Sequence, residues 1–99
     1  MSYSYIYEPR AIIEFENAFE WYWEQSHSAA ENFESRVKEK IHDICSNPFL
    51  YRKIRKHFRE VHQKKYPFSI VYSVNEETLT IIIMSIFHHR RNPKRKYTA

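Results

Sequence analysis

The 99-residue sequence predicts one α+β domain, with an N-terminal strand, an antiparallel helical hairpin on one face of a mainly antiparallel four-stranded sheet, and a basic C-terminal tail. Three observations predict this class. Residues 3–7 alternate with period two, residues 10–46 hold two stretches with apolar spacing of three and four, and the second half holds alternating apolar segments. No linker or repeat divides the chain, so we expect a single domain over residues 1–99, with the tail from about residue 92.

The first strand and first helix follow from simple periodicity. Tyr3, Tyr5 and Tyr7 share one side of a short strand, and Pro9 ends it while suiting the first turn of a helix. Residues 10–25 then repeat apolar side chains at helical spacing, with carboxylates mostly on the other side. These positions predict an amphipathic helix.

A second helix starts after a polar break. Ser28 and Glu31 have the spacing of a capping box, which predicts that the helix begins at Ser28. An apolar stripe, on which Cys45 is expected to be a small core residue, continues to Pro48, where proline ends the pattern. Because only a few polar residues join the two helices, they should pack antiparallel.

The second half predicts three strands. Residues 57–66 form a strand with poor alternation, and residues 66–74 place Tyr66, Phe68, Ile70, Tyr72 and Val74 on one core face. Residues 75–77 make a hairpin turn. Residues 78–87 are apolar on both faces, as expected for a central covered strand.

Charge is distributed unevenly along the chain. Lys and Arg number 16 against 12 Asp and Glu, a net charge of +4. Residues 1–49 hold four basic and nine acidic residues, whereas residues 50–99 hold twelve basic and three acidic. Acidic charge therefore falls on the helices and basic charge on the sheet and tail, which favours a polyanionic or acidic partner.

Composition excludes several classes of protein. The chain has no glycine, which excludes the phosphate-binding P-loop and the dinucleotide fingerprint. Its single cysteine forms no intramolecular disulfide, and no Cys/His spacing resembles a zinc site, so we expect no cofactor and no metal. The N-terminus lacks the features of a signal peptide and no segment is long enough to span a membrane, so a cytoplasmic location is expected.

Several short motifs occur in an order typical of one family. They are an early strand, Ala18-Phe-Glu-Trp-Tyr, a helix ending Asn47-Pro48, Arg59-Glu-Val, Tyr66-Pro-Phe-Ser-Ile-Val-Tyr72, an Ile-rich strand and His88-His-Arg-Arg-Asn-Pro93. In this order the chain resembles the RelE/ParE superfamily of bacterial toxins over essentially its whole length. The resemblance implies a cognate protein antitoxin, growth arrest, and a homodimer or a toxin–antitoxin hetero-oligomer.

The resemblance also implies one of two targets. ParE-like members inhibit DNA gyrase without enzymatic activity, and RelE-like members cut mRNA on the ribosome without a metal. The ending from His88 to Pro93 is closer to ParE-like sequences, so the first hypothesis is gyrase inhibition. The alternatives are an mRNA endonuclease and a non-toxic, degenerate binding partner.

Candidate site residues follow from the chemistry of RNA cleavage, which needs a base, an acid and cations around the phosphate. The candidate catalytic residues are His88, His89, Arg91, Arg59 and Tyr97, the last because some RNase members carry a C-terminal tyrosine. Candidate contacts for the target or antitoxin are Arg90, Lys94, Arg95, Lys96, Lys64, Lys65 and Trp21; the resemblance places catalytic lysines near Lys64 and Lys65.

Each candidate also has a structural interpretation. His88 and His89 point to opposite faces if the strand continues, so at most one faces a given site. Arg59 has the alternative role of a sheet arginine with an ion-pair partner. Trp21 and its two aromatic neighbours cannot all face inward on one helix, so at least one is exposed and available to a partner.

Overall fold

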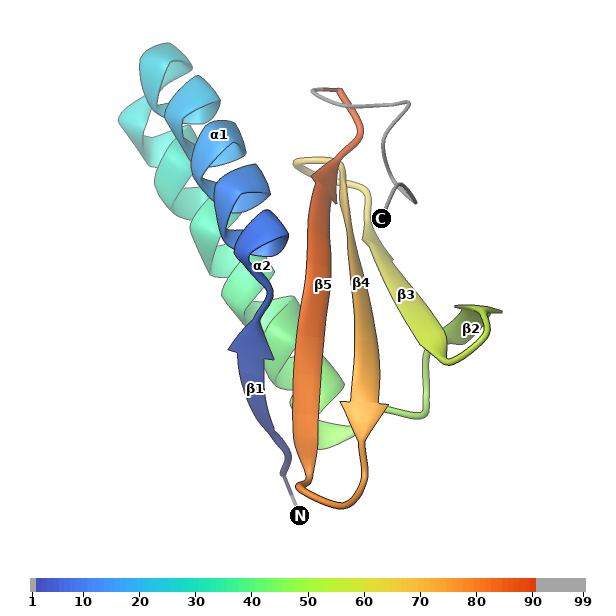
Figure 1. Ribbon diagram of the computed structural model, residues 1–99. Coiled ribbons are helices and arrows are strands. Elements are labelled where there is room, and N and C mark those ends of the chain that lie inside the picture. The colour runs from blue at the N-terminus through green and yellow to red at the C-terminus, as the bar shows by residue number, and fades with distance from the viewer. Residues whose placement is uncertain (1, 91–99) are drawn as a thin grey trace.

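Two antiparallel helices cover one face of a five-stranded sheet (Figure 1). The computed structural model describes residues 2–90. The elements are β1 (Ser4–Tyr7), α1 (Pro9–Gln25), α2 (His27–Ser46), β2 (Arg52–Arg55), β3 (Phe58–Gln63), β4 (Phe68–Asn75) and β5 (Thr80–His88). The strand order is β1-β5-β4-β3-β2, with β1 parallel to β5 and all other pairs antiparallel. The predicted α+β class and the N-terminal strand are confirmed.

The second helix begins earlier than the capping-box pattern predicts. Ser26, not Ser28, is the N-cap, and its Oγ accepts a hydrogen bond of 3.3 Å from the Ala29 amide. Ser26 has extended backbone angles, which allow its side chain to face the first turn, whereas Ser28 already lies inside the helix. The prediction of a cap at Ser28 was therefore wrong.

The sheet has one strand more than the four that were expected. Strand β2 is short, exposed and basic, and it pairs with β3 at the edge of the sheet. Its run of charges carries no apolar alternation, which is why periodicity did not reveal it. Charges and an irregular register are typical of an edge strand that is protected against further pairing.

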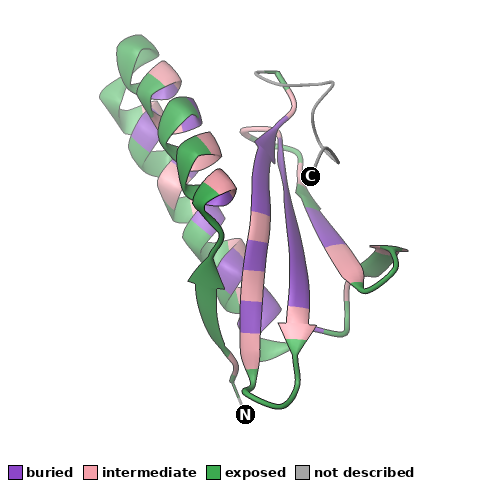
Figure 2. Cartoon of the chain, in the orientation of Figure 1, coloured by how far each residue is buried: buried purple, intermediate pink, exposed green. Residues whose placement is uncertain are grey.

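The core lies between the helices and the two central strands. Figure 2 shows β4 and β5 as largely buried and β1 as exposed. Phe33 from α2 packs edge-on against Phe68 from β4, with ring centroids 5.6 Å apart. Tyr72 is fully buried and donates a 2.6 Å hydrogen bond to the Pro48 carbonyl, and burial raises its pKa to about 12. Cys45 is buried in this core, as predicted.

An irregularity in the β4–β5 pairing is held by a carboxylate from α1. The register shifts between Val71 and Tyr72. On β5, the Ser85 hydroxyl and the Ile86 amide donate hydrogen bonds of 2.7 and 3.1 Å to Glu14 Oε1. Pairing of β5 with β1 ends at Ile83. Beyond this point Glu14 thus supplies a hydrogen-bond acceptor for polar groups of β5 that β1 does not reach.

The tight turns are built without glycine. Lys56, Tyr66 and Leu79 have positive φ angles of 50°, 54° and 52°. The β4–β5 turn is supported by Asn75, whose Oδ1 accepts hydrogen bonds from the amides of Glu77 and Thr78. Tyr66, expected at the start of a strand, lies in the β3–β4 turn.

Within residues 2–90, neither helix has a stretch long and apolar enough to cross a membrane.

Candidate functional site

The two adjacent histidines at the end of β5 face opposite sides of the sheet, as predicted. His88 is 2% exposed and faces the helices, where its Nε2 lies 2.7 Å from the Tyr22 hydroxyl. Burial raises the pKa of Tyr22, which therefore stays protonated and can donate to this nitrogen. The rings of Trp21 and Phe33 also pack on His88. These contacts favour a packing role for His88 over a catalytic one.

Arg59 also lies on the helix-covered side of the sheet. Its guanidinium donates a 2.8 Å hydrogen bond to the Tyr51 carbonyl and lies 5.2 Å from the centroid of the Phe49 ring. Arg59 therefore fixes the segment that joins α2 to β2. This geometry supports a structural role and does not bring Arg59 to His89.

The opposite, open face of the sheet brings together a chain of polar side chains. Ser69 on β4 lies directly across from His62 on β3, and its Oγ lies 2.6 Å from His62 Nδ1. The same Oγ lies 2.7 Å from Nε2 of His89, just after β5. One serine hydroxyl therefore joins an imidazole on β3 to an imidazole just after β5.

A buried carboxylate continues this chain. Glu60 Oε1 lies 3.4 Å from His62 Nε2 and accepts a 3.1 Å hydrogen bond from Arg52. The Glu60 side chain is fully buried, although it lies on the face away from the helices. Because a buried carboxylate needs charged or hydrogen-bonding neighbours, Arg52 and His62 explain how Glu60 is tolerated there. We name Arg52, Glu60, His62, Ser69 and His89 the open-face cluster.

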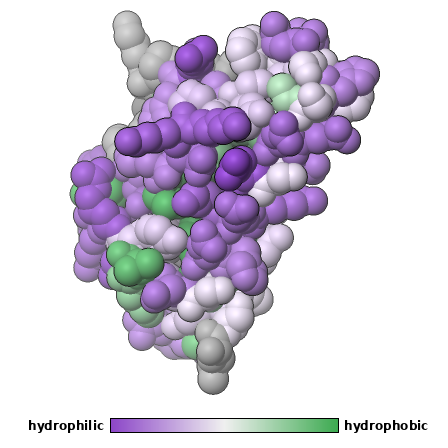
Figure 3. Space-filling model, turned by 180° about the vertical axis from the view of Figure 1, so that it is seen from behind, coloured by the Kyte–Doolittle hydropathy of each residue, from purple (hydrophilic) through white to green (hydrophobic). Residues whose placement is uncertain are grey.

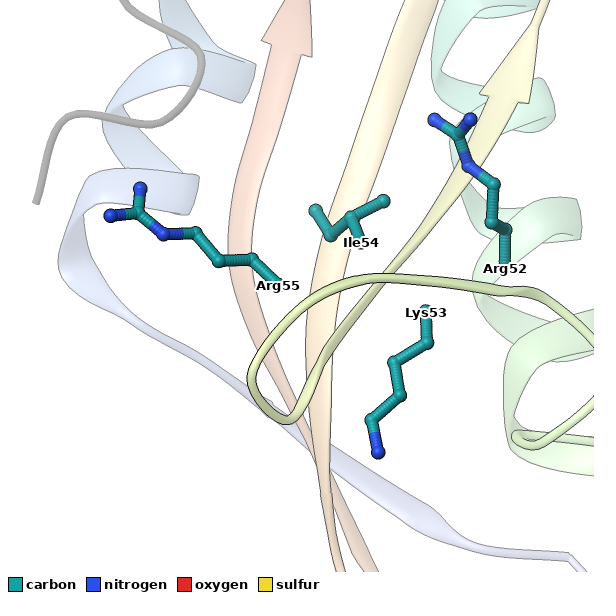
Figure 4. A pocket seen from close by; sticks show the side chains of 4 residues that line it. All are labelled: Arg52, Lys53, Ile54 and Arg55. Carbon is teal, nitrogen blue, oxygen red and sulfur yellow. The ribbon is translucent and has the colours of Figure 1, made fainter.

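The cluster adjoins a basic edge. Arg52, Lys53, Ile54 and Arg55, the four residues of β2, line a pocket of about 290 Å³ (Figure 4). Figure 4 shows that the charged side chains of Arg52, Lys53 and Arg55 spread in different directions from the strand. Such an arrangement suits an extended anion, such as a nucleic-acid backbone or an acidic peptide, better than one small ligand.

The other predicted contact residues do not meet at one place. Lys64 and Lys65 are exposed in the β3–β4 turn, where Lys65 lies 5.9 Å from the Tyr66 ring centroid. Arg90 is exposed directly after β5. Five of the predicted residues lie outside the described residues: Arg91, Lys94, Arg95, Lys96 and Tyr97.

The three consecutive aromatic residues of α1, at positions 21–23, differ in burial, as expected. Tyr22 is buried and Trp21 is half-buried, whereas Trp23 is 43% exposed and stacks on His27 at 3.7 Å. The prediction that one of the three is exposed is confirmed.

Figure 3, which views the molecule from behind the sheet, shows a predominantly hydrophilic surface with only small hydrophobic patches.

Four members of the open-face cluster were not predicted: Arg52, Glu60, His62 and Ser69. Glu60 and His62 alternate along β3, and Ser69 lies on the polar side of its predicted strand, so the spacing indicated a shared face. The contact itself depends on the register between β3 and β4, which the sequence does not specify. Among the described residues, no group of His, Cys, Asp and Glu side chains is arranged to hold a metal ion.

The fold is shared with bacterial toxins of known structure. The Escherichia coli RelBE toxin–antitoxin complex is 15% identical, with 87% of this chain and 95% of that chain covered and a TM-score of 0.63. A mutant E. coli RelE toxin in the free state is 17% identical, with coverages of 94% and 90% and a TM-score of 0.66. The RelBE2 complex of Mycobacterium tuberculosis is 12% identical, with coverages of 89% and 99% and a TM-score of 0.64.

At these identities the solved structures establish the shared fold alone. No curated protein matches the chain. The model of the family described as "ParE toxin of type II toxin-antitoxin system, parDE" matches residues 5–93, which is most of the sequence. The chain therefore belongs to the ParE toxin family of type II toxin–antitoxin systems, within the RelE/ParE superfamily.

Proposed function

We propose that this toxin arrests growth by inhibiting DNA gyrase and is neutralised by a cognate protein antitoxin. The observation that carries the proposal is the match of the ParE family over residues 5–93. The geometry supports it because His88 and Arg59, two residues expected in an RNase site, are engaged in packing and in holding a loop. Since gyrase acts in the cytoplasm, we place the toxin there as well.

An antitoxin partner is supported by the solved relatives. Two of them were determined as complexes, RelBE and RelBE2. On this chain, the exposed cations of β2 provide a basic edge that an acidic segment of an antitoxin can approach. Co-expression with the neighbouring gene should yield a small protein that co-purifies and restores growth.

A supercoiling assay tests the gyrase proposal. Relaxed plasmid, purified gyrase and the purified chain are incubated with ATP, and we expect loss of supercoiled product in proportion to the toxin. Adding the antitoxin in equimolar amount should restore the product. Undiminished supercoiling with folded chain in excess over gyrase would overturn the proposal.

A second candidate function is ribosome-dependent, metal-independent cleavage of mRNA. The observation that favours it is the open-face cluster, where Ser69 is hydrogen-bonded to two histidines. Glu60, which accepts a hydrogen bond from Arg52, lies 3.4 Å from one of them, His62. Imidazoles can transfer protons to and from the reacting oxygens, and arginine stabilises the charge on the phosphate.

Programmed ribosomes test this second function. If it is correct, the message is cut at defined positions in the presence of EDTA, and His62→Ala or His89→Ala abolishes the cuts. His57→Ala, a change at a histidine of the β2–β3 turn outside the cluster, is the matched control. Intact message in this assay and undiminished gyrase activity would together leave a degenerate binding partner as the remaining function.

A further inference from the structure

We propose that two copies of the free toxin pair through the outer edge of β1, antiparallel and related by a two-fold axis at Ile6. Among residues 2–90, β1 is the terminal strand on its side of the sheet, so no further strand occupies its outer edge. Figure 1 shows β1 at the side of the sheet opposite β2. The pairing would join two five-stranded sheets into one continuous sheet. It uses no residue of the open-face cluster and does not depend on whether gyrase or mRNA is the target.

Strand β1 lacks the features that protect the other edge of the sheet. Strand β2 carries three cations and an irregular register, whereas β1 has the sequence Ser-Tyr-Ile-Tyr and a regular register with β5. The side chains of Tyr5, Ile6 and Tyr7 are 38 to 56% exposed. An exposed edge strand without charge or proline is a template for pairing with another strand. The two edges therefore suit different partners, an acidic one at β2 and an uncharged strand at β1.

The backbone groups that face this edge follow from the hydrogen bonds on the inner side of β1. The amides of Ser4 and Glu8 donate hydrogen bonds of 3.1 and 2.9 Å to carbonyls of the neighbouring segment, residues 79–83. Because the direction of the backbone groups alternates along a strand, the even-numbered residues face β5. The amides and carbonyls of Tyr5 and Tyr7 therefore point away from β5, toward the outer edge.

These outward groups are symmetric about Ile6. The Tyr3 amide lies on the same side but donates a 2.9 Å hydrogen bond to the Cys45 carbonyl at the end of α2, so the open stretch is limited to Tyr5 and Tyr7. In an antiparallel pair, residues that exchange both hydrogen bonds lie directly opposite each other. A two-fold axis at Ile6 places Tyr5 of each copy opposite Tyr7 of the other, and each outward amide then meets a carbonyl. Such self-complementarity is what a two-fold contact requires.

A groove beside β1 receives a side chain of the second copy. The rings of Tyr5 and Tyr7 lie on the helix-facing side of β1, with centroids 5.5 Å apart. Tyr7 lines a groove of about 190 Å³ together with the apolar residues Ile12, Phe15 and Val37. Opposed residues of paired strands point to the same face, so Tyr5 of the second copy would lie beside Tyr7 and enter this groove. The remaining lining residues are charged and can bond a phenol hydroxyl: Glu16, Glu34 and Lys38.

The charges at this edge are also compatible with a second copy. Residues 2–7 hold no charged side chain, so two chains of net charge +4 bring no cations together at the axis. In this register Pro9, the first residue of α1, lies opposite Tyr3 of the other copy, beside the end of α2. The positive end of one helix dipole thus approaches the negative end of another. On the opposite face of the strand, the two exposed Ile6 side chains meet and bury apolar surface.

Sedimentation equilibrium of the purified full chain measures this association. We expect a monomer–dimer equilibrium. Ile6→Lys places two cations opposite each other at the axis and should raise the dissociation constant of the dimer about tenfold or more. The matched control is Leu50→Lys, because Leu50 is 66% exposed and lies just before β2, at the other edge of the sheet. The control should leave the dissociation constant unchanged, and far-UV circular dichroism checks that both variants are folded.

A cysteine at the axis tests the register. Opposed residues that exchange no hydrogen bonds have Cα atoms about 4.5 Å apart, which is within reach of a disulfide. Ile6→Cys should therefore form a disulfide-linked dimer when oxidised with copper phenanthroline. Ser4→Cys, on the same face of β1, is the control, since the two copies of this residue would lie about 13 Å apart along the strands. Cys45 is present in both variants and is buried.

Four results would contradict the pairing. The first is a chain that stays monomeric at every concentration, and the second is a dimer whose dissociation constant is the same in Ile6→Lys. The third is cross-linking of Ser4→Cys as fast as that of Ile6→Cys. The fourth is a monomeric toxin whose Ile6→Lys variant no longer binds its antitoxin, which would assign the edge of β1 to the antitoxin.

Discussion

Replacing Tyr22 with phenylalanine tests whether His88 is a packing residue. The change removes one hydroxyl and, with it, the 2.7 Å hydrogen bond to His88 Nε2, while the ring stays in place. The site is buried, since Tyr22 is 8% exposed and His88 is 2% exposed. Losing a hydrogen bond at such a site costs about 1 to 3 kcal/mol of unfolding free energy. For a domain of this size, that corresponds to a fall in Tm of about 5 to 15 °C.

Urea unfolding followed by tryptophan fluorescence measures this cost. Tyr5→Phe is the control, because Tyr5 is 45% exposed and its replacement should change the free energy by less than about 0.5 kcal/mol. We expect the midpoint to shift for Tyr22→Phe with an unchanged m-value. If Tyr22→Phe is as stable as the parent chain, the hydroxyl does not hold His88, and the assignment of His88 to packing fails.

Three further predictions concern stability. Glu14→Ala removes two hydrogen bonds accepted from β5 and should lower the unfolding free energy by about 2 to 4 kcal/mol, as measured by urea titration. In the same titration the control Glu16→Ala, at an exposed position, should leave the unfolding free energy almost unchanged. Tyr72 ionises near pH 10 when unfolded and near pH 12 when folded, so stability should fall by about 2 to 3 kcal/mol from pH 10 to 12. Tyr72→Phe should show a smaller fall in unfolding scans at these pH values, and an equal fall would contradict the assignment. Leu79→Gly relieves a positive φ of 52° and should raise the unfolding free energy by about 0.5 to 1 kcal/mol, whereas a loss of stability would mean that the leucine contacts outweigh the strain.

The helices and central strands are predictable because each buries apolar side chains at a regular spacing or in a continuous run. Apolar spacing of three and four gives α1 and α2 within a few residues, and alternation or continuous apolar character gives β4 and β5. Strand β2 is different, since its stability comes from pairing with β3 and not from apolar side chains. The N-cap at Ser26 depends on the extended backbone angles of that residue, which the capping-box spacing at Ser28 does not predict.

The functional site is predictable only in part. Adjacent histidines at a strand end must face opposite sides, so the division between His88 and His89 follows from the pleat. The assignment of His88 to packing follows from its contacts with Tyr22, 66 residues away, and with the rings of Trp21 and Phe33, which the pleat alone does not predict. Likewise His62 and Ser69 meet through the register of β3 against β4, and a shift of one residue would place them on opposite faces. The register depends on the packing of the whole sheet, so a local sequence pattern does not predict it.

The order in which macromolecular synthesis stops after induction tests the proposed target most directly. The chain is expressed in cells without its antitoxin, and the incorporation of labelled thymidine and labelled methionine is followed over the first minutes. The gyrase proposal predicts that DNA synthesis falls first while translation continues, and that co-expressed antitoxin prevents both effects. A primary collapse of translation with DNA synthesis initially intact would contradict it and would favour mRNA cleavage at the open-face cluster.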